Sequence, residues 1–162
     1  MLRDINYDRL LQYSLRILSK KRYTEGEMRR KLEKQILKLE NIDTQVAEQV
    51  IERLNELKYL NDEQFVRDYI SDRIRFKPRG KYLIKQELIN KCVEEFLIDK
   101  IIEETEINEV EMATEVLNKL SKKLENCDFR KKQQRAFSAL SSKGFSADTI
   151  YKSIKNCYRD GA

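Results

Sequence analysis

Two fifteen-residue stretches decide the fold: LINKCVEEFLIDKII at residues 88–102 and LSSKGFSADTIYKSI at residues 140–154. Both carry apolar side chains at the same offsets of five, ten and fourteen from the first residue. These residues are Leu88, Val93, Ile98 and Ile102 in the first stretch and Leu140, Phe145, Ile150 and Ile154 in the second. The stretches start 52 positions apart, and a fixed period of this size indicates a repeated structural unit.

A third copy precedes these two. Leu32, Ile42, Ala47 and Ile51 keep the same order if the residues around Gln35 to Asn41 contain an insertion of about five residues. The sequence therefore predicts three repeats, with boundaries at residues 1–59, 60–106 and 107–162. A unit of this size buries too little apolar surface alone, so we expect the repeats to stack into an elongated, curved array.

The spacing within each repeat is helical. Apolar residues recur at three and four positions rather than at two, and four Gly and one Pro leave few interruptions in 162 residues. We predict an all-α protein of three tandem three-helix, helix-turn-helix-like repeats. The predicted helices cover residues 7–21, 25–38, 44–58, 62–76, 81–91, 94–105, 108–125, 131–143 and 147–158.

Helix starts are predicted where a capping residue lies between two apolar residues five positions apart. The N-caps predicted in this way are Thr24, with Glu27 completing a capping box, Asn61, Ser146 and, more weakly, Asp43. Gly144 is predicted to end a helix in the left-handed conformation.

The composition argues against catalysis. The chain has no His, which removes the commonest general base near neutral pH. Cys92, Cys127 and Cys157 are spaced unlike a zinc site or a disulfide framework, so we expect reduced, buried thiols. No apolar run exceeds three residues, which predicts a cytoplasmic protein without a membrane partner. We expect no cofactor, no metal site and no small-molecule substrate.

The net charge of +5 is unevenly distributed. Residues 16–34 carry eight basic and three acidic side chains, and residues 119–135 carry seven and two. Residues 73–86 carry six basic and no acidic side chains, whereas residues 94–115 carry nine acidic side chains and one Lys. Such segregation favours a polyanionic partner, although the first and third basic windows equally fit solvated helix faces.

The middle window is the strongest candidate contact, because its basic residues surround the Pro78–Gly80 break, where backbone can approach phosphates. Its residues are Arg73, Arg75, Lys77, Arg79, Lys81 and Lys85. The secondary basic faces are Lys20, Lys21, Arg22, Arg29, Arg30, Arg130, Lys131, Lys132 and Arg135. Phe76 and Tyr82 lie beside the break; we expect them in the core, with stacking on a base as the alternative.

Several of these stretches resemble the bacterial RecX family. The segments are YSLRILSKKRYTEGEMRRKL at 13–32, LNELKYLNDEQFVR at 54–67, RIRFKPRGKYLIKQELINKC at 73–92 and SKGFSADTI at 142–150. The resemblance extends from about Asp8 to Tyr158 and includes repeat number and order. Cys92 departs from it, because the family commonly has Gly there, and Cys92 must end its helix in another way.

The resemblance implies a non-enzymatic regulator of DNA repair, recombination and the SOS response. It implies that the protein binds the RecA recombinase filament on single-stranded DNA, without sequence specificity, and lowers its ATPase, strand-exchange and co-protease activities. We expect a monomer. Two other functions remain open: an independent nucleic-acid-binding protein, and a protein-only scaffold whose binding depends weakly on salt.

Overall fold

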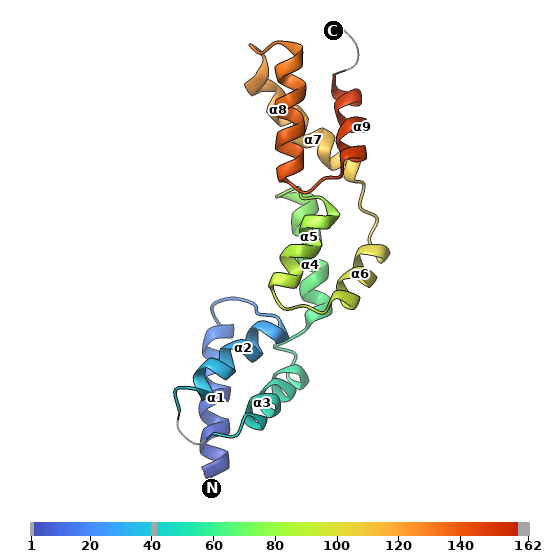
Figure 1. Cartoon of the computed structure of the whole chain (residues 1–162). Coiled ribbons are helices and arrows are strands. Elements are labelled where there is room, and N and C mark those ends of the chain that lie inside the picture. The colour runs from blue at the N-terminus through green and yellow to red at the C-terminus, as the bar shows by residue number, and fades with distance from the viewer. Residues whose placement is uncertain (1, 40–41, 159–162) are drawn as a thin grey trace. The chain divides into compact units, whose positions relative to one another are not determined.

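The computed structural model describes residues 2–39 and 42–158 and contains nine α-helices and one short 3₁₀ helix in that part of the chain (Figure 1). They are α1 (Leu2–Leu18), α2 (Glu25–Ile36), α3 (Gln45–Glu56), α4 (Asp62–Arg75), α5 (Lys81–Asn90), α6 (Glu95–Glu104), α7 (Glu109–Ser121), η1 (Lys122–Leu124), α8 (Phe129–Ser142) and α9 (Ala147–Cys157). These residues form no strand, and the all-α prediction is confirmed.

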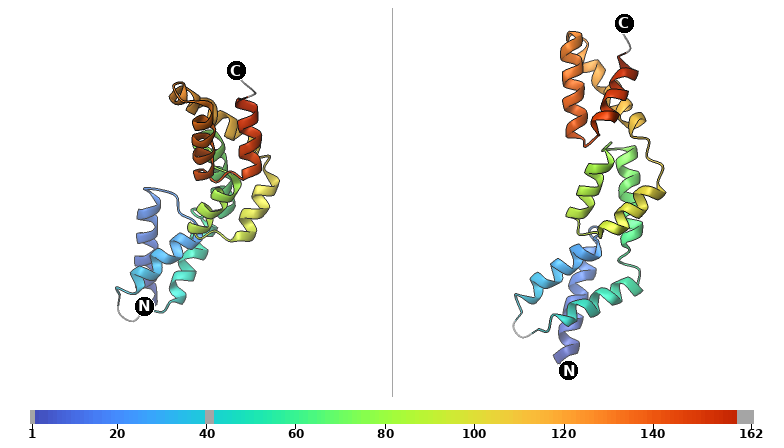
Figure 2. Two further views of the ribbon diagram at one scale, coloured as in Figure 1. Left: turned by 45° about the horizontal axis from the view of Figure 1, so that its top comes forward. Right: turned by 45° about the vertical axis from the view of Figure 1, so that its right-hand side comes forward.

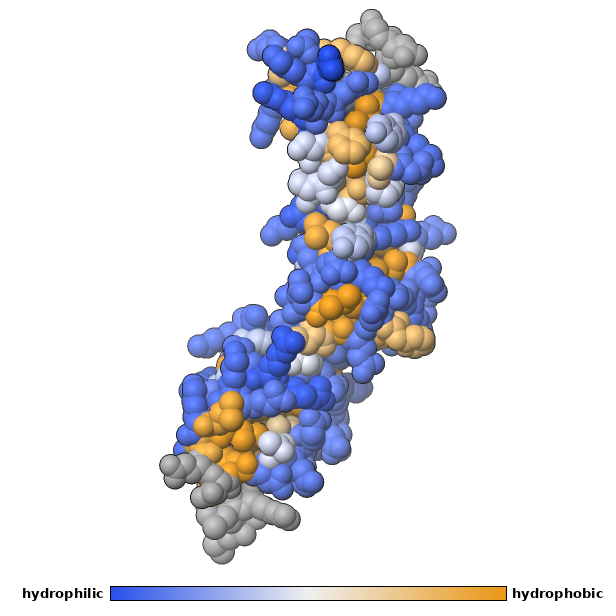
Figure 3. All heavy atoms as spheres, in the orientation of Figure 1, coloured by the Kyte–Doolittle hydropathy of each residue, from blue (hydrophilic) through white to orange (hydrophobic). Residues whose placement is uncertain are grey.

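The chain forms two compact units: residues 1–66 with 88–97, and residues 67–87 with 98–162. The three limits between the units, at 66/67, 87/88 and 97/98, all fall inside the second predicted repeat, so the three-repeat boundaries at 59/60 and 106/107 stay a prediction. Figure 3 shows that hydrophilic residues cover most of the visible face of each unit, with smaller apolar patches among them. Within the described residues, no helix is long and apolar enough to span a membrane.

The first unit is built around α1, α2 and α3, which pack against one another. Its core contains Leu10, Met28, Leu32, Ile36, Val46, Ala47, Val50, Ile51, Leu54 and Leu60. The predicted capping box at Thr24 is present: its side chain accepts from the Glu27 N–H, and Glu27 accepts from the Thr24 N–H. The predicted insertion at 35–41 includes residues 40 and 41, which lie outside the described residues.

In the second unit α7, α8 and α9 pack together, as both views of Figure 2 show. Leu140, Phe145, Ile150 and Ile154 are buried as the repeat pattern predicts. In the preceding copy Leu88, Val93 and Ile98 are buried, whereas Ile102 is half-buried and its neighbour Ile101 has no exposed surface. Ser153, which lies 52 residues after Ile101, also has no exposed surface, so the two copies bury the same side of the helix.

Each unit contains an equivalent junction, in which the residue before one helix donates a hydrogen bond to a carbonyl just after the end of another helix. In the first, the Thr24 hydroxyl donates to the Lys91 carbonyl, and the Glu25 N–H donates to the Asp62 carboxylate at 2.8 Å. In the second, the Gly80 N–H donates to the Lys143 carbonyl at 2.8 Å. Lys143 lies 52 residues after Lys91, the same period that relates the apolar positions. The repeat thus extends from the core residues to the contacts of the start of α2 with the end of α5, and of the start of α5 with the end of α8.

Each of these carbonyls precedes a residue with positive φ. Gly144 has φ 79°, as predicted, and its N–H donates to the Ser141 carbonyl. Cys92 has φ 61° and donates in the same way to the Ile89 carbonyl, so it ends α5 in the left-handed conformation despite its side chain. A Cβ on Gly26 would overlap the Cys92 Cβ and carbonyl oxygen, so glycine is required at that close approach.

Four local predictions are wrong. The first helix begins at Leu2 and ends at Leu18 rather than covering 7–21, because the chain breaks into a turn at Ser19. The helix predicted to Glu125 ends at Ser121 and tightens into η1. The cysteines are free but only half-buried, and burial raises the pKa of Cys157. The weaker N-cap prediction, Asp43, is displaced by one residue: Thr44 is the N-cap of α3, and the Asp43 carboxylate accepts from the Gln45 N–H at 3.0 Å.

Candidate functional site

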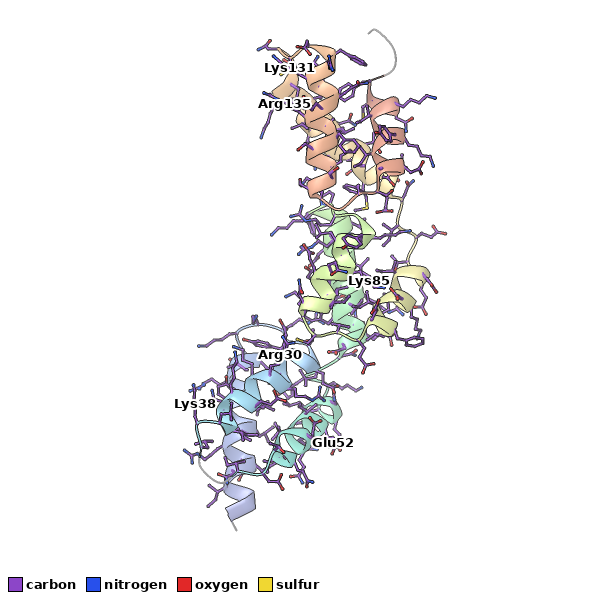
Figure 4. All side chains as sticks on the ribbon, in the orientation of Figure 1. Arg30, Lys38, Glu52, Lys85, Lys131 and Arg135 are labelled. Atoms are coloured by element: carbon purple, nitrogen blue, oxygen red, sulfur yellow. The ribbon has the colours of Figure 1, made fainter. Side chains whose placement is uncertain are left out.

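The middle basic window lies in the second unit, on the end of α4, the segment 76–80 and the first turns of α5. Three of its six cations have acidic partners that the sequence window did not contain. Arg73 Nε donates to Glu87 at 2.7 Å, Arg79 Nε lies 3.7 Å from the other Glu87 oxygen, and Lys85 Nζ lies 2.7 Å from Asp99. Figure 4 shows Lys85 on the side of α5 toward α6. The absence of acidic residues from sequence positions 73–86 therefore does not extend to the surroundings of these cations in the structure.

Tyr69, Arg73, Arg79 and Glu87 form what we call the Glu87 network. The Tyr69 hydroxyl donates to Glu87 at 2.6 Å, and the Arg73 guanidinium lies 4.3 Å from the centre of the Tyr69 ring. Burial, together with the hydrogen bond to Glu87, raises the pKa of Tyr69 to about 12. Burial opposes ionisation of Glu87, but the hydrogen bonds from Tyr69 and Arg73 and the nearby guanidinium charges hold its pKa below the ordinary value.

The other three cations of the window are less constrained. Arg75 and Lys77 are exposed, Lys81 is half-buried, and none of the three forms a salt bridge within the described residues. The Lys81 N–H donates to the Glu109 carboxylate at 2.8 Å, which fixes the start of α5. The window thus combines three cations with acidic partners and three whose charge is available to a ligand.

Phe76 and Tyr82 are not core residues. Phe76 is 74% exposed and Tyr82 is 69% exposed, so the expected burial of these aromatics is wrong. Phe76 directly follows α4, and Tyr82 lies on the outer side of α5. The buried residue of this segment is Ile84, two positions after Tyr82. The two rings are therefore placed where a ligand can stack on them.

The basic face of the first unit is divided between a turn and a helix. Lys20, Lys21 and Arg22 are exposed between α1 and α2, and the Lys21 ammonium lies 4.4 Å from the centre of the Tyr23 ring. Arg29 is held by Glu25 and Glu48, with the shortest contact 2.6 Å, and these bonds raise its pKa. Arg30, on α2 in Figure 4, is exposed.

The basic face of the second unit beyond the window lies on the first turns of α8. Arg130, Lys131 and Arg135 are exposed and Lys132 is half-buried; Figure 4 shows Lys131 and Arg135 on this helix. Lys131 Nζ lies 3.9 Å from Asp128, the N-cap residue, and Arg135 Nη1 lies 3.5 Å from Cys127 Sγ. Cations at a helix N-terminus oppose the helix dipole, so this cluster costs stability unless an anion binds nearby.

The structure also contains a site that the sequence predictions missed. An open cleft of about 370 Å³ in the second unit lies between segment 76–79, α7 with η1, and the end of α8. Five basic side chains line this cationic cleft: Lys77, Arg79, Lys119, Lys123 and Lys143. Three apolar side chains, Val116, Leu120 and Ala139, also line it.

The positive charge in this cleft is poorly compensated. No acidic residue lines it, and Lys77, Lys119, Lys123 and Lys143 form no salt bridge within the part of the chain described. There, Arg79 Nε is buried without a hydrogen-bond partner. Burial and the neighbouring Arg79 charge lower the pKa of Lys143. The arrangement suits an anion.

The sequence does contain a signal for part of this cleft. Val116, Lys119, Leu120 and Lys123 have helical spacing, so two lysines and two apolar residues share one face. Lys143 is not visible in this pattern, because only the junction between Gly80 and Lys143 brings the end of α8 to segment 76–79. The predicted site and the cleft share Lys77 and Arg79.

These features define a helical-repeat protein with basic surfaces, and comparisons with known proteins agree. The family models for the second and third three-helix domains of RecX match residues 61–101 and 107–154. The regulatory protein RecX of Prosthecochloris aestuarii is 30% identical over 93% of this chain and 95% of its own length. The chain belongs to the RecX family of regulatory proteins.

Other relatives differ in how much of them is covered. RecX of Chlorobium phaeobacteroides is 24% identical, over 96% of this chain and 98% of its own length. RecX of Streptococcus agalactiae is 26% identical over 79% of this chain, and the match spans about half of that relative, 50%. The crystal structure of RecX from Lactobacillus salivarius shares the fold with a TM-score of 0.79 at 23% identity, over 95% of this chain and 97% of that one.

Proposed function

We propose that the protein is a non-enzymatic, cytoplasmic regulator that binds the RecA filament on single-stranded DNA and lowers its ATPase, strand-exchange and co-protease activities. Membership of the RecX family carries this proposal, and the basic surfaces of both units support a partner that contains nucleic acid. The role in DNA repair, recombination and the SOS response follows from the same partner.

Within the predicted contact, the proposal gives its six cations different tasks. Arg75, Lys77 and Lys81 meet phosphate or acidic filament surface, because their side chains have no acidic partner within the described residues. Arg73 and Arg79 connect the end of α4 and segment 76–80 to α5 through Glu87. Lys85 connects α5 to α6 through Asp99. The basic faces on α2 and α8 are secondary contacts.

The acidic residues of segment 94–115 support a complex in which the basic surfaces, and not this segment, face the DNA. Glu94, Glu95, Glu103, Glu104, Glu106, Glu111 and Glu115 are all exposed. Exposed carboxylates are repelled by phosphates, so this segment faces protein or solvent in the complex. A filament that combines protein and DNA provides surfaces for both charge classes.

Cosedimentation with RecA, with and without single-stranded DNA and a slowly hydrolysed nucleotide, tests the proposal. We expect the protein to pellet with the DNA-bound filament and to lower its ATP hydrolysis. The variant R75E/K77E/K81E should bind far more weakly than K20E/K21E/R30E, which reverses three exposed charges in the first unit.

Four outcomes would contradict parts of the proposal. Absence of the protein from the pellet under all conditions refutes RecA as the partner. Equal binding by the two variants, with helix content retained, refutes the middle window as the principal contact. Tight binding to one DNA sequence without RecA identifies an independent DNA-binding protein, whereas filament binding that is insensitive to salt identifies a protein-only contact.

A further inference from the structure

The cationic cleft combines charge with an exposed aromatic ring. Phe76 lines the cleft beside Lys77 and is 74% exposed. An inorganic anion alone would neutralise the lysines. It would leave the Phe76 ring and the apolar lining residues exposed to water. The ligand that fits the whole cleft therefore carries a negative charge next to a flat apolar group.

A nucleotide unit of a single strand has this combination. Its phosphate carries the charge, and its base offers a flat face that stacks on aromatic side chains with little regard to sequence. A duplex keeps its bases stacked on one another and presents mainly phosphates to a basic surface. An acidic peptide supplies the carboxylates but has no regular flat group beside each charge. The exposed Phe76 ring thus favours single-stranded nucleic acid over both.

The size and openness of the cleft agree with this ligand class. A volume of about 370 Å³ lies in the range of small-ligand sites, which is roughly 300–1,000 Å³. The cleft is open to solvent rather than enclosed, so a polymer can enter it from the surface without threading. Lys119 of α7 and Lys123 of η1, four residues apart, both line the cleft.

We propose that the cationic cleft of the second unit binds single-stranded nucleic acid, with phosphates held by Lys119, Lys123 and Lys143 and a base stacked on Phe76. The inference deepens the proposed function, in which single-stranded DNA is one part of the partner. It adds a base contact and three cations outside the predicted window. The cleft acts in the absence of RecA, so the two proposals can fail separately.

Fluorescence anisotropy with a labelled thymidine oligonucleotide, over a series of salt concentrations and without RecA, tests the phosphate contacts. The variant K119Q/K123Q/K143Q should bind roughly 10- to 100-fold more weakly at 0.1 M salt and lose about two units of the log–log salt slope. The matched control is K122Q/K152Q/K155Q, which removes the same charge from exposed lysines outside the cleft. It should keep most of the affinity and of the slope.

The base contact has its own test. Phe76→Ala should weaken binding of the thymidine oligonucleotide about five-fold or more and leave binding of an abasic oligonucleotide of equal length unchanged. Phe76→Tyr should restore the affinity for thymidine. Tyr82→Ala, at an equally exposed ring outside the cleft, is the matched control. Circular dichroism of each variant monitors the fold.

Four results would overturn the inference. Equal losses in the two lysine triples indicate net charge rather than the cleft. Equal losses on thymidine and abasic oligonucleotides by Phe76→Ala indicate that no base stacks there. Displacement of the oligonucleotide by poly-glutamate at lower charge concentration than by unlabelled thymidine oligonucleotide assigns the cleft to an acidic protein. A wild-type protein that does not bind single-stranded DNA refutes the inference directly, while filament binding would still support the proposed function.

Discussion

The Glu87 network and the cationic cleft share Arg79 but use positive charge in opposite ways. In the network, the Glu87 carboxylate accepts hydrogen bonds from Tyr69 and Arg73 and lies 3.7 Å from Arg79 Nε. In the cleft, four lysines join Arg79 with no acidic residue in the lining. Removing a charged side chain from the Glu87 network should therefore lower the free energy of unfolding. Removing one from the cationic cleft should leave the free energy of unfolding unchanged or raise it. Basic residues that look equivalent in the sequence are structural in one place and available to a ligand in the other.

Removal of the Glu87 side chain should produce the largest effect on this comparison. Glu87→Ala leaves Arg73 and Arg79 half-buried beside each other without a counter-charge, and it removes the acceptor of Tyr69. We expect a loss of about 2–3 kcal/mol in the free energy of unfolding, because partly buried charges lose their partner. Urea unfolding followed by circular dichroism measures it. A loss below about 0.5 kcal/mol would show that solvent replaces the carboxylate at little cost.

The pH dependence of Glu87 sharpens the comparison. Because the folded-state pKa lies below the ordinary value of 4.5, its contribution is fully present above that pH and is lost as the pH falls through the folded value. Glu87→Gln keeps the shape and an acceptor but not the charge. We expect the variant to be about 1–2 kcal/mol less stable than the wild type at pH 7, with the difference narrowing towards pH 3.

A stability difference of constant size from pH 7 to pH 3 would contradict this prediction. It would mean that Glu87 acts through its hydrogen bonds alone and not through its charge. Unfolding midpoints at several pH values, measured on both proteins in the same buffers, decide between the two.

Two arginines two positions apart offer a smaller but well-controlled test. Arg73 is 19% exposed and bonded to Glu87, whereas Arg75 is exposed and has no ion-pair partner within the described residues. Arg73→Gln should cost about 1–2 kcal/mol, and Arg75→Gln should change stability by less than about 0.5 kcal/mol. Thermal and urea unfolding of both variants provide the comparison. Equal effects would remove the distinction between structural and available cations in this window.

The sequence predicted the repeat and much of its capping because these depend on local chemistry. Thr24 and Ser146 cap α2 and α9 as their spacing predicts, and Gly144 adopts positive φ. Leu32, Leu88 and Leu140, the equivalent positions of the three copies, are fully buried. Periodicity and capping need only neighbours along the chain, which the sequence displays directly.

The sequence did not predict which cations are neutralised. The middle window was counted to Gln86, and Glu87, the next residue, pairs with Arg73 and Arg79. A count of charges along the sequence includes only residues that are close in the chain. In the structure, α4 and α5 bring Arg73 and Glu87, 14 positions apart, into contact. The cleft was missed for the same reason, since Lys143 reaches it only through the junction with Gly80. The exposure of Phe76 was not predicted either, because it depends on the direction in which the chain leaves the end of α4.

Lys143→Gln should produce the smallest effect and the opposite sign. Burial and the Arg79 charge lower the pKa of Lys143, so its charged form is less favourable in the folded state than in the unfolded one. A lysine with a lowered folded-state pKa weakens the fold below that pKa, and stability rises as the pH increases through it. At pH 7 the substitution removes this unfavourable charge, and we expect the free energy of unfolding to rise by a few tenths of a kcal/mol, at most about 0.5.

The control is Lys122→Gln, which removes one exposed charge outside the cleft and should leave stability unchanged. Melting temperatures of the two variants at low salt, where the repulsion is least screened, measure the difference. A destabilisation by Lys143→Gln comparable with that of Arg73→Gln would mean that Lys143 is held by the fold, and the opposition between the two regions would then be wrong.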